Sequence, residues 1–141
     1  MGRDVRPRVH NVNTQSDVIE FMLARVWEIT ENSNMNYHFI DIGSGGGRVV
    51  NAAQGFKSTK GYEIDQGNDF FDATINRSPT IYYMFNPFSQ SETARLNEHL
   101  AVANGYLVYY DSQWHDELDP VIFKEVYSRN IVGGTFKVYL L

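Results

Sequence analysis

Three glycines at alternate positions follow an acid in the segment Phe39-Ile40-Asp41-Ile42-Gly43-Ser44-Gly45-Gly46-Gly47-Arg48. An apolar run, a glycine-dense turn and a second apolar segment form the pattern of a buried strand, a tight loop and a helix start. Glycine lets the backbone turn sharply and approach a ligand closely, because no Cβ stands in the way. We therefore expect N–H groups of this loop, with the helix start, to face a ligand at the carboxyl end of the strand.

The glycine spacing distinguishes two kinds of nucleotide site. A dinucleotide fingerprint requires G-x-G-x-x-G/A. Counted from Gly43 the sixth residue is Arg48, and counted from Gly45 it is Val50, so neither register fits and a nicotinamide oxidoreductase is excluded. The spacing present is D-x-G-x-G-x-G, from Asp41 to Gly47. A glycine-rich turn without a ligand is the alternative.

A second acid, Glu63, lies in the next expected strand, Thr59 to Ile64. It follows Gly47 by 16 residues, near the distance at which a strand-end acid meets a ribose in βαβ nucleotide folds. An ionised carboxylate offers two acceptor oxygens, which suit paired ribose hydroxyls. Many strands also end in an acid by chance.

Polar residues follow two later apolar runs. Asn86-Pro87-Phe88 comes directly after Thr80 to Phe85, and Asp111 and His115 end or follow the run that begins at Tyr106. Asp111 and His115 could supply an acid/base pair, although turn residues are common at both places. Because the carboxyl ends of parallel strands share one edge, we expect all these groups to lie along the same crevice.

The loop from Asp41 to Arg48 resembles the first motif of class I S-adenosylmethionine-dependent methyltransferases. More narrowly, it is similar to that of small bacterial and viral methyltransferase-like proteins with a D-x-G-S-G-x-G-R loop and a later N-P-F. Asn86-Pro87-Phe88 resembles the fourth motif of amino-group methyltransferases, [D/N/S]-P-P-[Y/F/W], except that Phe88 replaces the second proline. That departure puts methylation of a nucleobase in doubt. The resemblance covers roughly residues 37–129.

The resemblance implies a Rossmann-like methyltransferase sheet that is mostly parallel, has helices on both faces and is abbreviated between its second and fourth strands. It implies S-adenosyl-L-methionine as cofactor, and an unidentified methyl acceptor that is a nucleic acid, a protein or a small molecule, with an amino nitrogen as one candidate. The cofactor-binding residues would be Asp41, Gly43, Ser44, Gly45, Gly47, Glu63 and Asp69, and the catalytic residues at the acceptor Asn86, Pro87 and Phe88. The alternative is a non-catalytic module that acts as a cofactor sensor or partner subunit.

The elements that must position these residues alternate between helix and strand. Helices are predicted from either Thr14 or Asp17 to about Thr30, briefly after Gly47, from the capping box at Ser89 to about Ala103, and from Asp119-Pro120 through Tyr127. Strands are predicted before the glycine loop and at Thr59 to Ile64, Thr80 to Phe85, Tyr106 to Asp111 and Thr135 to Leu141. This alternation favours an α/β fold with a mostly parallel sheet, in one domain over residues 1–141 with an irregular lead over 1–15.

The segment from Asp65 to Pro79 is too short for a helix and a further strand. Either Asn68 to Arg77 forms a crossover helix and the third strand is missing, or Gly67 to Phe71 corresponds to a third motif and the helix is deleted. We favour the second interpretation. Asp69 would then approach the adenine, as the resemblance implies.

Bulk composition limits the remaining classes. The chain has 141 residues, a formal net charge of −5 and no cysteine. The charge argues against strong non-specific binding to nucleic acid, and the lack of cysteine excludes disulfides and cysteine-ligated zinc. The histidines and acids show no metal-ligand pattern. With no membrane-length apolar run and no signal peptide, we expect a cytoplasmic protein without a membrane partner. Whether it forms a homodimer is left open.

Overall fold

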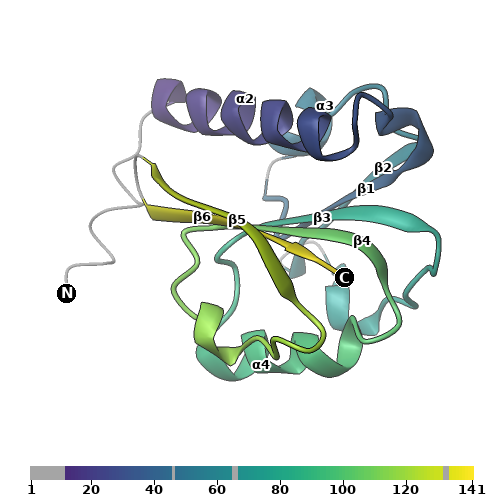
Figure 1. The fold of residues 1–141 in the computed structure, drawn as a ribbon, viewed down its shortest axis with the longest axis vertical. Coiled ribbons are helices and arrows are strands. Elements are labelled where there is room, and N and C mark those ends of the chain that lie inside the picture. The colour runs from purple at the N-terminus through teal and green to yellow at the C-terminus, as the bar shows by residue number, and fades with distance from the viewer. Residues whose placement is uncertain (1–11, 46, 65–66, 132–133) are drawn as a thin grey trace.

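The computed structural model describes residues 12–45, 47–64, 67–131 and 134–141. These residues form one sheet, three α-helices and short 3₁₀ turns (Figure 1). The α-helices are α2 (Val12–Ile29), α3 (Arg48–Ala52) and α4 (Gln90–His99). The strands are β1 (His38–Ile42), β2 (Ser58–Tyr62), β3 (Pro79–Phe85), β4 (Asn104–Tyr110), β5 (Lys124–Ile131) and β6 (Gly134–Leu140), and the 3₁₀ turns are η1 (Asn34–Asn36), η3 (Phe70–Asp72) and η4 (His115–Glu117).

The sheet is mixed, which contradicts the predicted fold class. Its strand order is β2-β1-β3-β4-β6-β5. The pairs β1–β2, β1–β3 and β3–β4 are parallel, whereas β4–β6 and β5–β6 are antiparallel. The described chain is therefore richer in strand than in helix, and the expected Rossmann-like methyltransferase sheet, mostly parallel and rich in helices, is wrong.

The error arises mainly at residues 119–131. A helix was predicted from Asp119 through Tyr127, and Asp119 does start a turn, since its side chain accepts a hydrogen bond from the Val121 N–H at 2.9 Å. The turn does not continue as a helix. The chain instead enters β5, an edge strand that pairs along its length with β6. Valine, tyrosine and isoleucine in this segment favour a strand, and the two consecutive glycines that follow in the sequence are a hairpin signal that outweighs the apolar spacing.

Helices cover both faces of this sheet (Figure 1). Helices α2 and α3 lie on one face and α4 lies on the other. Side chains alternate along each strand, so every strand contributes to two cores. In β3, Ile81 and Tyr83 pack toward α2, while Tyr82 and Met84 pack with Leu96 of α4. Asp41 lies two residues after Phe39 in β1, so its side chain lies on the same face of the sheet, the one that α2 covers.

The described part of the segment between β2 and β3 contains no crossover helix, which agrees with the favoured interpretation that the helix is deleted. Among residues 67–78 the structure has only the 3₁₀ turn η3, so a crossover helix from Asn68 to Arg77 is wrong. Within the described residues no further strand covers β2, which is an edge strand. Asp65 lies outside the described residues.

The order of the strands in the sheet changes direction at β1, because the strands that follow it in sequence are added first on one side and then on the other. Strand β2 lies on one side of β1 and β3 on the other, and all three run parallel. In open sheets of this kind the carboxyl ends of the strands at such a reversal leave a crevice that binds ligands. The glycine loop, Glu63 and Asn86 follow these three strands directly.

No helix in the part of the chain that the structure describes is long and apolar enough to cross a membrane.

Candidate functional site

The glycine loop is tied to the end of β2. The N–H groups of Gly43 and Ser44 both donate to the Tyr62 carbonyl, at 2.7 and 2.9 Å. The N–H of Gly45 donates to Oε1 of Glu63 at 2.8 Å. Sequence reasoning expected loop N–H groups to face a ligand, but these three are bonded within the protein. The loop can therefore contribute to a ligand site through its shape rather than through these three N–H donors.

Two glycines are required by close packing around the loop. Gly43 has φ +79°, and a Cβ there would lie 2.7 Å from Cβ of Pro87. A Cβ on Gly61 of β2 would lie 2.6 Å from Cβ of Ser44. The contact with Pro87 links the glycine loop directly to the Asn-Pro-Phe turn. Gly61 was missed, although a glycine inside a strand signals close approach of another chain segment.

Glu63 lies beside the glycine loop, as its spacing predicted. It follows β2 and is half-buried, and its bond from Gly45 places its carboxylate against the loop. A carboxylate has about four lone-pair positions, so this bond is compatible with further hydrogen bonds from a ligand hydroxyl. Glu63 and Gly43 of the same loop line one pocket, which is described below.

The Asn86 amide is held in a defined orientation. Its Oδ1 accepts from the Tyr109 hydroxyl at 3.0 Å, and its Nδ2 donates to Oε1 of Gln113 at 3.1 Å. The Tyr109 hydroxyl in turn accepts from the Trp114 N–H at 3.2 Å. Both polar atoms of the amide are therefore paired, the oxygen as an acceptor and the nitrogen as a donor. Tyr109 was missed by sequence reasoning, which gave it no role in the site.

Phe88 packs against a neighbouring ring. Its ring centroid lies 4.9 Å from that of Phe71, and Arg95 covers Phe71 with its guanidinium carbon 4.2 Å from the ring centre. An acceptor that stacks on Phe88 must therefore use the part of the ring that this packing leaves exposed.

Asp69 caps the turn η3. Its Oδ1 accepts from the Phe71 N–H at 3.0 Å. The residue lines a small pocket of about 330 Å³ on the outer side of β2 as well as the larger pocket described next. This position is open to a ligand, although nothing in the geometry distinguishes adenine from another group.

A pocket of about 670 Å³ lies at the carboxyl ends of β1, β2 and β3. Its volume lies within the roughly 300–1,000 Å³ typical of small-molecule sites. Six of the predicted site residues line it: Gly43, Glu63, Asp69, Asn86, Pro87 and Phe88. Ile42, Tyr62, Ile64, Asn68, Phe70, Phe85 and Glu92 complete the lining and were not predicted. We name this the crevice pocket.

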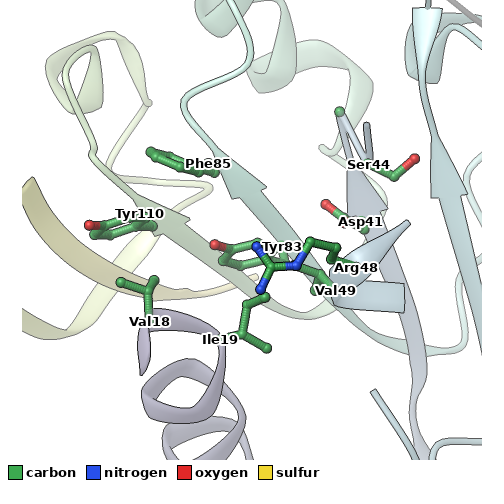
Figure 2. A pocket seen from close by; sticks show the side chains of 10 residues that line it. Val18, Ile19, Asp41, Ser44, Arg48, Val49, Tyr83, Phe85 and Tyr110 are labelled. Atoms are coloured by element: carbon green, nitrogen blue, oxygen red, sulfur yellow. The ribbon is translucent and has the colours of Figure 1, made fainter. Parts of the chain in front are cut away.

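Asp41 and Ser44 line a different pocket, of about 210 Å³, between α2 and the sheet (Figure 2). We name this the α2-side pocket. Asp41 is only 3% exposed, and burial, followed by the nearby negative charge of Glu63, raises its pKa from 3.8 to about 7. The carboxyl group is therefore able to hold or release a proton near neutral pH. Arg48, which sequence reasoning gave no role, lines the same pocket.

The other candidates do not join these pockets. Gly47 has φ +86° and starts α3, without lining either pocket. Asp111 is buried at the end of β4, while His115 contacts Asp116 through Nδ1 at 3.2 Å. Neither residue lines the crevice or the α2-side pocket. Within the described residues no cluster of three or more histidines and acids could hold a metal ion.

Comparison with known proteins does not identify a family for this chain. No protein-family model matches the chain, and no curated protein matches it. The function must therefore be argued from the two pockets and their residues.

Proposed function

We propose that this chain binds S-adenosyl-L-methionine in the crevice pocket and transfers its methyl group to an acceptor that approaches Asn86. The observation that carries the proposal is the contact of the glycine loop with Glu63 on one wall and with Pro87 on the other. It supports a single site made of three segments that sequence reasoning identified separately. The mixed sheet adds no support for a methyltransferase fold, so the proposal depends on the site alone.

The residues of the crevice pocket fit the cofactor's nucleoside end. Glu63 supplies a carboxylate for ribose hydroxyls, and Tyr62, Ile64 and Phe70 supply apolar surface for a base. The volume of about 670 Å³ leaves room for an acceptor as well as a ligand of this size.

The cofactor supplies an activated methyl group, so the protein mainly has to hold donor and acceptor in line. Such alignment contributes roughly 7–11 kcal/mol to lowering a reaction barrier. Asn86 serves this purpose, because Tyr109 and Gln113 fix the direction of its amide. The second lone pair of Oδ1 can accept a hydrogen bond from an acceptor amino group. The acceptor itself is unidentified.

Binding of the cofactor is tested by calorimetry with S-adenosylmethionine and S-adenosylhomocysteine. We expect Glu63→Ala to weaken both by about 1.5–3 kcal/mol, the range for hydrogen bonds to charged groups. Glu63→Gln retains an oxygen for the Gly45 N–H and should lose less. Glu98→Ala, which removes an exposed acid from α4, is the matched control and should leave binding unchanged. Unchanged affinity in Glu63→Ala would contradict the ribose assignment.

A non-catalytic cofactor-binding module is the second candidate. It is favoured by the packing of Phe88 on Phe71 and by the absence of a longer helix or a strand among residues 67–78. Incubation with methyl-labelled cofactor and separate pools of nucleic acid, protein and small molecules distinguishes the two. Label in any pool supports the enzyme. Binding without transfer to any of them supports the module.

A further inference from the structure

The crevice pocket adjoins a further pocket at the edge of the sheet. This pocket has a volume of about 330 Å³, and Tyr62, Asn68 and Asp69 line it as well as the crevice pocket. Lys60 and Thr74 line this pocket and not the crevice pocket. We name it the β2-edge pocket. A ligand that reaches the three shared residues from the crevice pocket therefore also borders the β2-edge pocket.

The position of β2 leaves this side of the site open. It is an edge strand, and within the described residues no further strand lies beyond it (Figure 1). The turn after β2 is bonded back to the strand end, because the N–H of Gly67 donates to the Ile64 carbonyl at 3.0 Å and that of Asn68 donates to the Glu63 carbonyl at 3.1 Å. These two bonds hold Asn68 and Asp69 beside the end of β2. The boundary between the two pockets is therefore a fixed part of the fold.

The β2-edge pocket combines an aromatic ring with charges of both signs. Nζ of Lys60 lies 5.0 Å from the centre of the Tyr62 ring, within the roughly 6 Å over which an ammonium attracts an aromatic face. Asp69 and Asp72 also line the pocket, so acids outnumber cations among its described residues and an anionic ligand group is disfavoured. An uncharged aromatic group can contact the Tyr62 ring and the Ala73 side chain, and it lies within reach of the Lys60 ammonium.

The proposed function gives the direction in which a ligand lies in the crevice pocket. The strand order β2-β1-β3 places the end of β1 between Glu63, which follows β2, and Asn86, which follows β3. With the methyl group at Asn86 and the ribose at Glu63, the base is the end of the ligand nearest the outer side of β2. The base then lies beside Tyr62 and Asp69, which the crevice pocket shares with the β2-edge pocket.

We infer that the site takes nucleosides whose base carries an uncharged aromatic substituent, and that the β2-edge pocket holds this substituent. The inference rests on the proposed function, which places the base at the boundary between the two pockets. An unsubstituted nucleoside leaves the β2-edge pocket unfilled. A substituent on the exocyclic amino group of adenine extends into it, because that amino group lies on the side of the base away from the ribose.

Calorimetry with two ligands tests the inference. S-adenosylhomocysteine has an unsubstituted adenine, and N⁶-benzyl-S-adenosylhomocysteine carries a benzyl group on the exocyclic nitrogen. Both are measured on the full chain and on Thr74→Trp, which places a large side chain in the β2-edge pocket from an exposed position. Thr59→Trp is the matched control, because Thr59 is also exposed but precedes Lys60 in β2, so its side chain lies on the opposite face of the sheet.

We expect the unmodified chain to bind the benzyl ligand no more than about threefold more weakly than S-adenosylhomocysteine. Thr74→Trp should weaken the benzyl ligand about 10-fold or more and leave S-adenosylhomocysteine unchanged, whereas Thr59→Trp should change neither. Lys60→Gln should weaken only the benzyl ligand, by about 2- to 5-fold, the range of an exposed cation–π contact. Lys124→Gln, which removes an exposed positive charge from β5, should leave both affinities unchanged.

Three results would overturn the inference while the proposed function stands. In the first, S-adenosylhomocysteine binds and the benzyl ligand binds more than about threefold more weakly. In the second, Thr74→Trp weakens both ligands equally or changes neither. In the third, the benzyl ligand binds equally well to Lys60→Gln and to the unmodified chain, which removes the preference for an aromatic group. Failure of the proposed function is distinct, because then neither ligand binds the unmodified chain and the inference fails with it.

Discussion

At the scale of single residues, the site is defined by side chains whose partners fix their direction. Asn86 is the clearest example, because a residue with φ +40° is uncommon and its amide is also bonded at both ends. Sequence reasoning could select Asn86 from the Asn-Pro-Phe motif. It could not find Tyr109, because nothing in an apolar strand distinguishes a tyrosine that orients a neighbour from one that only fills the core.

The Tyr109–Asn86 bond can be measured without knowing the acceptor. We expect Tyr109→Phe to lower the free energy of unfolding by about 1–3 kcal/mol, because the partly buried Trp114 N–H also loses its acceptor. Urea denaturation of Tyr109→Phe, Asn86→Ala and the double variant forms a double-mutant cycle. The double variant should lose less than the sum of the single losses, by about 0.5 kcal/mol or more. Additive losses would show that the bond does not contribute.

At the scale of elements, the strands and their order of appearance were largely predictable. The strands β1, β2, β3, β4 and β6 were expected within one or two residues, as were the end of α2 and the capping box of α4, in which Ser89 and Glu92 bond reciprocally. The element that failed was β5. Its apolar spacing fits a helix, whereas its β-branched and aromatic residues and the two glycines after it fit a hairpin strand. These local signals conflict, and the pairing of β5 with β6 decides between them.

The glycine loop shows how one element constrains another. Ala at position 43 would combine backbone strain at φ +79° with a clash against Pro87, whereas at Gly55, with φ +80°, a Cβ would have no neighbouring atom within 4 Å. We expect Gly55→Ala to cost about 1–2 kcal/mol from the left-handed backbone alone. Gly43→Ala should cost about 1–3 kcal/mol more from overpacking. Urea denaturation measures both, and equal losses would contradict the packing of the loop on the Asn-Pro-Phe turn.

At the scale of the whole molecule, the sheet brings two acids together at the ends of neighbouring strands. The parallel pairing of β1 with β2 places Asp41 opposite Gly61, two residues before Glu63. Sequence reasoning predicted that both acids lie at the same edge. It did not predict the buried state of Asp41, because this depends on α2, which covers that face of the sheet (Figure 1).

This arrangement makes the stability of the whole protein depend on pH. The pKa of Asp41 is raised from 3.8 to about 7 in the folded protein, by burial and then by Glu63. The folded state therefore binds a proton more tightly than the unfolded state does. The stabilisation that comes from this tighter proton binding is fully present below 3.8, the pKa of Asp41 in the unfolded chain. It is lost as the pH rises toward about 7, the pKa of Asp41 in the folded protein, and the free energy of unfolding falls by up to about 1.4 kcal/mol per pH unit.

Asp41→Asn has no such titration, so its stability relative to the unmodified protein should increase between about pH 4.5 and pH 7.5 and then remain level. The free energy of unfolding in urea, measured for both proteins across this range, gives the difference, in which the effects of the other carboxylates largely cancel. Glu63→Gln is the second comparison: without the Glu63 charge the pKa of Asp41 should be lower, and the loss of stability should end at lower pH. If the free energy of unfolding depended on pH in the same way for Asp41→Asn and for the unmodified protein, the pKa of Asp41 would not be raised in the folded protein.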